Sequence, residues 1–312
     1  MSGALLIVSG GGEDMGRAAA LLEKALPGRD IRLWPALGDA REIAYALVWQ
    51  PPRGLLASLP GLRAVLSLGA GIDHVLSDPA LPADVPVYRL IDDDLTARMS
   101  EYVVLHVLRH HRQQPAYEAQ QRAHVWRPLR QPAARRRRVG ILGLGVLGAD
   151  AAAKLALLGF AVSGWSRREK SLAGVQVYHG AAGLGALLGR SDILVCLLPA
   201  TPATAGLLNR KRLARLPAGA SLINAGRGAL LVEDDLLALL AEGHVSHATL
   251  DVFANEPLAG DHPLWDHPAV TITPHVAAAT SGRALTGFVA RTLAALEAGK
   301  EPPGRVDRDQ NY

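Results

Sequence analysis

The sequence predicts an α/β protein built from two doubly wound parallel sheets, each in a Rossmann-like or flavodoxin-like domain. Short apolar runs alternate with helical stretches in the first third of the chain. After a change of composition, a second and more regular alternation begins at residue 139, and a glycine-rich turn joins its first strand to its first helix. Strands separated by helices pair in parallel and are covered on both faces, so this pattern favours doubly wound sheets.

Composition supports a folded protein of two ordinary domains. The chain has 312 residues, of which 49% are hydrophobic and 20% charged, so a core can form and wholesale disorder is excluded. The formal charge of +4 is too small to call for nucleic acid or anionic lipid as a partner. The apolar run at 4–8 is too short for a signal peptide, and charged residues interrupt the run at 149–160. A single cysteine, Cys196, fits a reducing compartment, so we expect a cytoplasmic protein without a membrane segment.

The two alternations also locate individual elements. The first predicts strands at 5–9, 44–49, 64–68 and 87–90, and a helix at 17–26. The second predicts six strands, at 139–142, 161–165, 193–198, 221–224, 249–252 and 271–273, with helices at 148–158 and 233–242. Residues 109–138 are rich in His, Gln, Arg and Pro, which places a domain transition near 99–138. A last helical stripe at 284–297 is expected to return to the first domain.

The glycine-rich turn has the spacing of a dinucleotide site. Gly143, Gly145 and Gly148 enclose Leu144, Val146 and Leu147 between a predicted strand and a predicted helix. The first glycine permits the tight turn, the second lets a pyrophosphate approach the backbone, and the third allows close packing of helix and strand. A chain with 32 glycines produces such spacing by chance, and a plain strand-to-helix turn is the alternative. The strand before the motif and the helix after it favour cofactor binding.

The next strand end indicates which dinucleotide is bound. NAD-binding proteins usually place a carboxylate there for the ribose 2′-hydroxyl. Here Ser166, Arg167 and Arg168 follow the strand instead, and Glu169 comes later, flanked by basic residues. A guanidinium binds a 2′-phosphate through paired donors, so we expect NADP, with NAD as a weaker alternative. A solvated basic turn is the other interpretation.

Three polar residues follow three successive predicted strands of the second alternation: Arg227, Glu256 and His275. Carboxyl ends of parallel strands share one edge, where ligands bind, so we expect these side chains to converge. Reduction of a 2-oxo acid needs a clamp for the carboxylate, a hydride donor and a proton donor. Arg227 can supply the clamp, a nicotinamide the hydride and His275 the proton, with Glu256 orienting the imidazole. Any one of the three alone could be an ordinary loop or surface residue; their coincidence favours catalysis, with no metal.

The motifs together resemble the D-2-hydroxyacid dehydrogenases, and are most similar to the glyoxylate/hydroxypyruvate reductase A subgroup. The resemblance covers essentially the whole chain. It is carried by the glycine turn at 143–148, by 197–199 with Thr201 and Thr204, and by the segments 224–228, 251–257 and 273–278. Further matching pieces are 49–52, 68–73 and 165–167.

The resemblance implies a cofactor domain inserted into a discontinuous substrate domain. The expected domains are 1–98 plus 276–312 for substrate and 99–275 for NADP. It implies that Arg227 binds substrate, Glu256 is the acid partner and His275 the general acid/base. Substrate residues are then Trp49, Gly69, Ala70 and Gly71 with Arg227 and His275, although a core tryptophan and a plain glycine turn are the alternatives. Further cofactor residues are expected at Leu198, Pro199, Thr204, Ala225, Gly226 and Asp251.

The resemblance also implies partners and an activity. The family is dimeric, with contacts from the helix and arm at 99–126, so a homodimer is expected. We take Arg135–Arg138 as a solvated entry to the strand, because no aromatic residues interleave with the arginines as they do in nucleic-acid sites. The implied activity is NADPH-dependent reduction of glyoxylate to glycolate and of hydroxypyruvate to D-glycerate. A reductase of another small 2-oxo acid and an NAD(P)-sensing regulatory protein are the alternatives.

Overall fold

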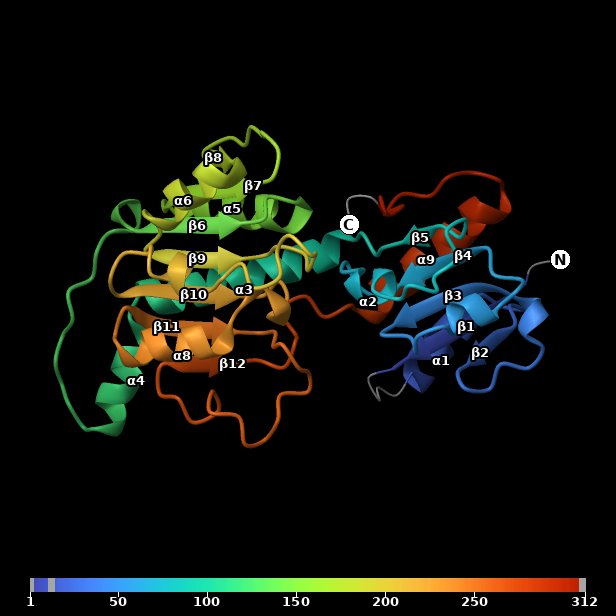
Figure 1. Ribbon diagram of the computed structural model, residues 1–312, viewed down its shortest axis with the longest axis horizontal. Helices are drawn as coiled ribbons and strands as arrows, with labels where there is room; N and C mark the ends of the chain where they lie inside the picture. The colour runs from blue at the N-terminus through green and yellow to red at the C-terminus, as the bar shows by residue number, and fades with distance from the viewer. Residues whose placement is uncertain (1–2, 11–14, 309–312) are drawn as a thin grey trace. The chain divides into compact units, whose positions relative to one another are not determined.

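The computed structural model describes residues 3–10 and 15–308, and the chain divides into two compact units (Figure 1). One unit is Met1–Leu95 with Thr280–Tyr312, and the other is Thr96–Ala279. The second unit is therefore inserted into the first. Its limits are 95/96 and 279/280, against the expected 98/99 and 275/276. Residues 1–2, 11–14 and 309–312 of the expected first domain lie outside the described residues.

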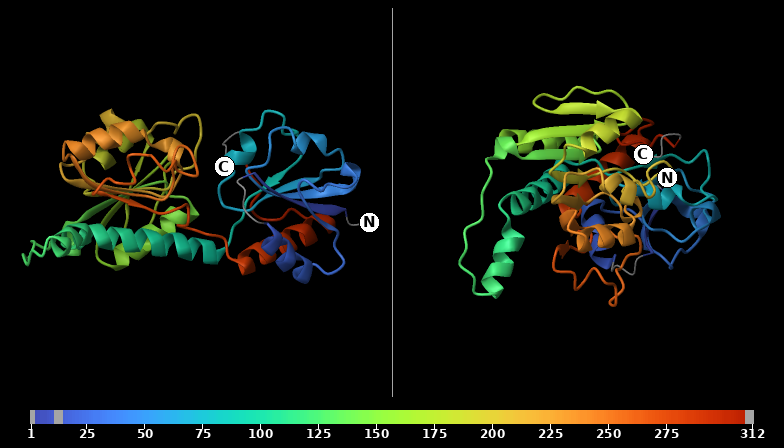
Figure 2. Two further views of the ribbon diagram at one scale, coloured as in Figure 1. Left: turned by 90° about the horizontal axis from the view of Figure 1, so that it is seen from below. Right: turned by 60° about the vertical axis from the view of Figure 1, so that its left-hand side comes forward.

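The first unit is built on a five-stranded sheet of order β2-β1-β3-β4-β5, in which all neighbouring strands are parallel. Its strands are β1 (Ala4–Ser9), β2 (Ile31–Leu33), β3 (Ile43–Trp49), β4 (Ala64–Ser67) and β5 (Val87–Tyr88). The helices are α1 (Gly16–Ala25), the short α2 (Asp73–Leu76) and α9 (Gly282–Glu297), and α9 packs against α1 (Figure 2). Six residues of α9 are buried, so its apolar stripe is used inside this unit.

The second unit is built on a seven-stranded sheet of order β12-β11-β10-β9-β6-β7-β8, again parallel throughout. Its strands are β6 (Arg138–Leu142), β7 (Ala161–Ser166), β8 (Gln176–His179), β9 (Ile193–Cys196), β10 (Ala220–Asn224), β11 (Val245–Leu250) and β12 (Val270–Ile272). The strand order reverses between β6 and β9. In sheets of this class the crevice for a ligand lies outside the carboxyl ends of the strands at such a reversal.

Helices cover both faces of this second sheet. Met99, Tyr102 and Val103 of α3 (Asp93–His111) and residues of α5 (Val146–Leu157) pack on one face. On the other face α6 (Gly180–Leu188), α7 (Arg210–Leu213) and α8 (Glu233–Ala241) pack. Neighbouring residues of β6 point to opposite cores, Ile141 to the first and Leu142 to the second. The predicted fold class, α/β with doubly wound parallel sheets, is confirmed.

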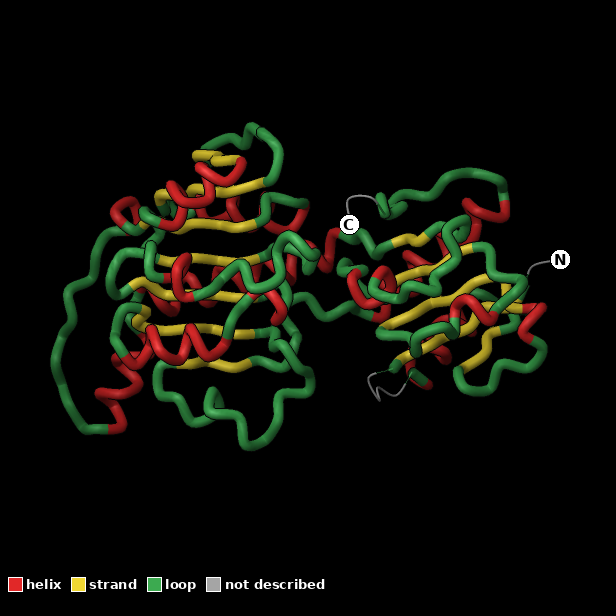
Figure 3. Tube along the Cα trace, in the orientation of Figure 1, coloured by secondary structure: helices red, strands yellow, loops and turns green. Residues whose placement is uncertain are grey.

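Several elements differ from those expected. The sheet of the second unit has seven described strands and not six, because β8 was missed, and β2 was missed in the first unit. Both are edge strands with half-exposed or exposed residues, so neither shows an apolar run. Strand β11 ends at Leu250, two residues before the expected end at 252. A further helix, α4 (Gln114–Arg122), lies in the polar segment and extends with the loop after it away from the sheet (Figures 2 and 3).

None of the helices in the described part of the chain is both long and apolar enough to cross a bilayer.

Candidate active site

The glycine turn between β6 and α5 leaves a cradle at the start of the helix. Gly143 has φ +100°, and a Cβ there would lie 2.8 Å from the carbonyl oxygen of Leu197. A Cβ on Gly148 would lie 1.9 Å from the carbonyl oxygen of Gly143, so the helix can approach the turn only without a side chain. Beside Gly145, in contrast, a Cβ would meet no atom within 4 Å. The middle glycine therefore faces open space, as a bound pyrophosphate requires.

This open space is a pocket of about 260 Å³. Its lining comes from the turn, from α5 and from the segment after β7: Leu144, Gly145, Val146, Ala149, Lys170, Ser171 and Leu172. Gly145 is the N-cap of α5 and has no side chain to cap it. The first amides of the helix are thus available to an anion, and the helix dipole favours negative charge there. The turn fits the phosphates of a dinucleotide.

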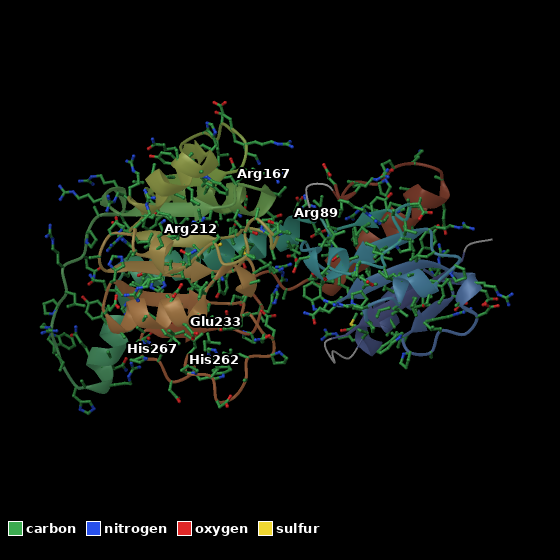
Figure 4. All side chains as sticks on the ribbon, in the orientation of Figure 1. Arg89, Arg167, Arg212, Glu233, His262 and His267 are labelled. Carbon is green, nitrogen blue, oxygen red and sulfur yellow. The ribbon has the colours of Figure 1, made fainter. Side chains whose placement is uncertain are left out.

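Basic side chains follow β7 on the same side of the turn. Ser166 is buried and donates from Oγ to the carbonyl oxygen of Arg168 at 2.6 Å, which holds the turn. Arg167, labelled in Figure 4, and Arg168 are exposed. Lys170 donates from Nζ to the carbonyl oxygen of Leu144 at 2.9 Å, so its ammonium lies at the glycine turn. In the sequence Lys170 is only one of the basic residues that flank Glu169, and its position two residues after Arg168 is the one signal of a role at the turn.

His275 and Glu256 form a hydrogen-bonded pair beyond the ends of β12 and β11. His275 Nδ1 lies 2.7 Å from Glu256 Oε2, with the two side chains 32% and 26% exposed. The other carboxylate oxygen, Oε1, accepts from the backbone amide of Phe253 at 2.9 Å. Burial raises the pKa of Glu256, but the hydrogen bonds from His275 and Phe253 and the charges of His275 and Arg227 lower it below its ordinary value. Glu256 is therefore an ionised acceptor that fixes the direction of the imidazole.

Arg227 lies in a loop that packs directly on the segment before Glu256. The loop follows β10, and a Cβ on Gly228 would lie 1.8 Å from the carbonyl carbon of Phe253. Arg227 is half-buried, and its Nη1 donates to the carbonyl oxygen of Gly226 at 2.7 Å. The structure thus brings Arg227, Glu256 and His275 together at one edge of the sheet.

The remaining cofactor candidates lie at the same edge. Leu198 and Pro199 follow β9, and Thr204 Oγ1 donates to the carbonyl oxygen of Pro199 at 2.7 Å. Ala225 and Gly226 follow β10, and a Cβ on Gly226 would lie 2.7 Å from the carbonyl oxygen of Leu198. The loops after β9 and β10 therefore pack against each other without a side chain between them.

Asp251 differs from the other cofactor candidates because it is 1% exposed. Its carboxylate accepts from Thr273 Oγ1 and from the backbone amides of Val276 and Ala277. The contacts of this carboxylate within the chain therefore lead to the segment that carries His275.

The expected substrate residues Trp49, Gly69, Ala70 and Gly71 lie in the first unit. The Trp49 ring lies against that of His74, with centroids 4.5 Å apart. A Cβ on Gly69 would lie 3.1 Å from the Trp49 ring, so the glycine loop rests on the indole. Ser67 Oγ donates to the carbonyl oxygen of Gly71 at 2.9 Å and shapes the same loop. Trp49 and the glycine loop therefore form one local group at the carboxyl ends of β3 and β4.

No group of three or more His, Cys, Asp or Glu side chains that could hold a metal ion occurs among residues 3–10 and 15–308.

Known proteins are similar to this chain in sequence and in structure. Residues 104–277 match the family described as D-isomer specific 2-hydroxyacid dehydrogenase, NAD binding domain. Glyoxylate/hydroxypyruvate reductase A of Yersinia enterocolitica is 46% identical over 296 residues, which are 93% of this chain and 94% of that protein.

Two crystal structures are similar along their whole length. The D-isomer specific 2-hydroxyacid dehydrogenase of Xanthobacter autotrophicus Py2, in complex with NADPH and MES, is 43% identical, with a TM-score of 0.93 and all of both chains covered. The NADPH-dependent glyoxylate/hydroxypyruvate reductase of Sinorhizobium meliloti, in complex with NADP and sulfate, is 44% identical, with a TM-score of 0.92, and 99% of this chain and 100% of that chain are covered. With the family match and these identities, the chain belongs to the D-isomer specific 2-hydroxyacid dehydrogenase family.

Proposed function

We propose that the protein is an NADPH-dependent reductase that converts glyoxylate to glycolate and hydroxypyruvate to D-glycerate. The observation that carries the proposal is the 2.7 Å contact between His275 and Glu256 beside the Arg227 loop, which is an acid–base pair next to a permanent cation. Two of the relatives named above, those of Yersinia and Sinorhizobium, bear this activity in their names, and the two crystal structures hold NADPH or NADP. Small 2-oxo acids carry the carboxylate and carbonyl groups that such a site would recognise.

Each of the three side chains has one role in the proposed reaction. The guanidinium of Arg227 binds the substrate carboxylate through paired donors. The imidazolium of His275 donates its proton from Nε2 to the substrate oxygen, because Nδ1 is held by Glu256. Glu256 orients the ring as an ionised acceptor. The nicotinamide supplies the hydride.

The second unit would hold the cofactor, and the first carries further residues that we assign to substrate. We assign residues 99–275 to NADP and residues 1–98 with 276–312 to substrate. Gly143, Gly145, Val146, Leu147 and Gly148 would receive the pyrophosphate, and Ser166, Arg167 and Arg168 the 2′-phosphate. No carboxylate stands at the end of β7, which supports NADP over NAD. Leu198, Pro199, Thr204, Ala225, Gly226 and Asp251 complete the proposed cofactor site, and Trp49, Gly69, Ala70 and Gly71 the substrate site.

The polar arm supports a homodimer as the working form. Trp126 is fully exposed, and Leu105 and Val125 are 59% and 46% exposed in the segment 99–126. Large apolar side chains at this density on a helix and arm are typical of a surface covered by a partner.

The single, buried cysteine supports a cytoplasmic location.

NADPH absorbance with purified protein tests the activity. We expect the NADPH absorbance to fall when glyoxylate or hydroxypyruvate is added, and to fall much more slowly with the Arg227→Ala variant. Oxidation of NADPH with pyruvate but not with these two acids would point to another 2-oxo acid as substrate. Tight NADPH binding without turnover of any of the acids would favour the regulatory alternative and reject the enzyme.

A further inference from the structure

One buried aspartate holds the backbone on both sides of the His275 Cα. The amide of His275 donates to the carbonyl oxygen of Asp251 at 2.9 Å. The amides of Val276 and Ala277 donate to Asp251 Oδ1 and Oδ2, each at 2.9 Å. Three consecutive amides therefore end on one residue, which is itself 1% exposed.

The conformation held in this way is an uncommon one. His275 has φ +54°, in the left-handed region that residues with a Cβ seldom occupy. Such a conformation persists only where the surrounding structure fixes it. The direction of the His275 side chain therefore depends on what keeps Asp251 in place.

Two hydroxyl groups continue the chain of hydrogen bonds from Asp251 to α3. Thr273 Oγ1 donates to Asp251 Oδ1 at 2.5 Å and lies 2.8 Å from Tyr102 Oη. The only proton of the Thr273 hydroxyl is used on Asp251, so Tyr102 must be the donor to Thr273. Burial raises the pKa of Tyr102, which keeps the phenol protonated for this bond.

Tyr102 has a fixed position of its own on α3, the helix that lies along one face of the sheet (Figure 1). Its ring lies against His106, with centroids 4.3 Å apart. It belongs to the same core cluster as Ala277, the last residue of the held segment. The phenol is thus anchored by packing and not only by its hydroxyl.

We propose that Tyr102 and Thr273 are positioning residues that act through Asp251 to fix the imidazole of His275. The proposal rests on the proposed function, because it deepens the role given there to His275. Without the two hydroxyls, Asp251 loses a donor and the left-handed segment loses its fixed support. The imidazole then points away from its productive direction for part of the time, and proton transfer slows.

The kinetic test compares Tyr102→Phe and Thr273→Val with two controls. Thr273→Ser keeps the hydroxyl. Tyr178→Phe removes a phenolic hydroxyl on the distant edge strand β8, where it accepts a hydrogen bond from Arg190. We expect kcat to fall about tenfold in the first two variants, with the KM for NADPH changed less than about twofold, and both controls to stay near the wild type. Equal loss in Thr273→Val and Thr273→Ser would overturn the proposal, because both side chains fit the site and only one keeps the hydroxyl.

A double-mutant cycle separates positioning from a general effect on stability. Residues that act through one group are non-additive. We expect Tyr102→Phe to cost about tenfold in the wild type and less than about twofold in the His275→Asn background. The same tenfold cost in both backgrounds would show that Tyr102 does not act through His275.

A readout without turnover keeps the inference independent of the substrate. In protein labelled with ¹⁵N-histidine, the hydrogen-bonded Nδ1 proton of His275 gives a downfield resonance, assigned by its absence in His275→Asn. We expect this resonance to shift or broaden in Tyr102→Phe and Thr273→Val and to stay in both controls. An unchanged resonance would overturn the proposal. If the resonance responds but no 2-oxo acid is reduced, the proposed function fails and the positioning role stands.

Discussion

The buried histidines of α3 make the second unit less stable in mild acid. His110 is 8% exposed, and burial lowers its pKa to about 3, helped by the nearby His247, His106 and Arg109. Its Nε2 lies 3.0 Å from Thr249 Oγ1. The folded state therefore keeps this imidazole neutral at a pH where the unfolded chain has already protonated it.

The sign and size follow from proton linkage. Because the unfolded state binds the extra proton, the free energy of unfolding falls as pH falls below about 6.5, by about 1.4 kcal/mol per pH unit and per histidine. Between about pH 7.5 and about pH 5, His110 alone lowers the free energy of unfolding by about 2 kcal/mol. This figure does not depend on how far below about 5 the folded pKa lies. The contribution is fully present above the unfolded pKa and is lost on acidification.

Urea unfolding of wild type and His110→Gln at both pH values measures this contribution. Glutamine can keep a contact to Thr249 but does not titrate. We expect the acid-induced loss of stability to be about 2 kcal/mol smaller in the variant. Replacement of the exposed His179 by glutamine is the matched control, because that ring is in solvent in both states. An equal acid loss in wild type and His110→Gln would refute the reasoning.

Four further predictions concern the site. His275→Asn should lower kcat by about 10²–10⁴, and a loss below about tenfold would reject its role as proton donor. Glu256→Gln should lower kcat by more than about tenfold, because the imidazole loses the carboxylate that orients it; an unchanged kcat would remove Glu256 from the mechanism. Arg167→Ala should lower the ratio of kcat/KM for NADPH over NADH, and an unchanged ratio would contradict a phosphate contact. Gly145→Ala should weaken NADPH binding at unchanged Tm, whereas Gly148→Ala should lower Tm, because its Cβ meets a backbone oxygen at 1.9 Å; a reversed pattern would show that the two glycines have been assigned wrongly.

The fold class could be predicted because central parallel strands are buried on both faces. Residues 193–196 are buried throughout and form a continuous apolar run, and 220–224 are buried throughout around an apolar centre at Leu222 and Ile223. The edge strands β2 and β8 could not be predicted in this way, because one side of each lacks a neighbouring strand and their residues are half-exposed or exposed. The helix α4 was hidden by its polar composition, with Gln120 its one buried residue.

The grouping of Arg227, Glu256 and His275 was predictable from strand order, because each follows a strand and parallel strands end at one edge. The contacts that hold them were not. Tyr102 precedes His275 by more than 170 residues, and nothing in the local pattern of α3 separates it from the core residues around it. The position of Lys170 could not be predicted either. A lysine soon after two arginines suggests a solvated basic turn, and only the structure shows that its ammonium contacts the glycine turn.

Two features of Asp251 explain how the edge of the sheet holds the His275 imidazole in one direction. Its backbone continues β11, so its position is fixed by the strand, with its amide donating to the carbonyl oxygen of Asn224 at 3.0 Å. Its carboxylate has room for about four donors and accepts from three, one hydroxyl and two amides. The carboxylate therefore ties the loop after β12 to the fixed end of β11. Glu256 fixes His275 from the side-chain end and Asp251 from the backbone end, so a ring 32% exposed to solvent is still held at both ends. An acid–base group that must meet substrate needs that exposure, and its precision has to come from neighbours that are themselves buried.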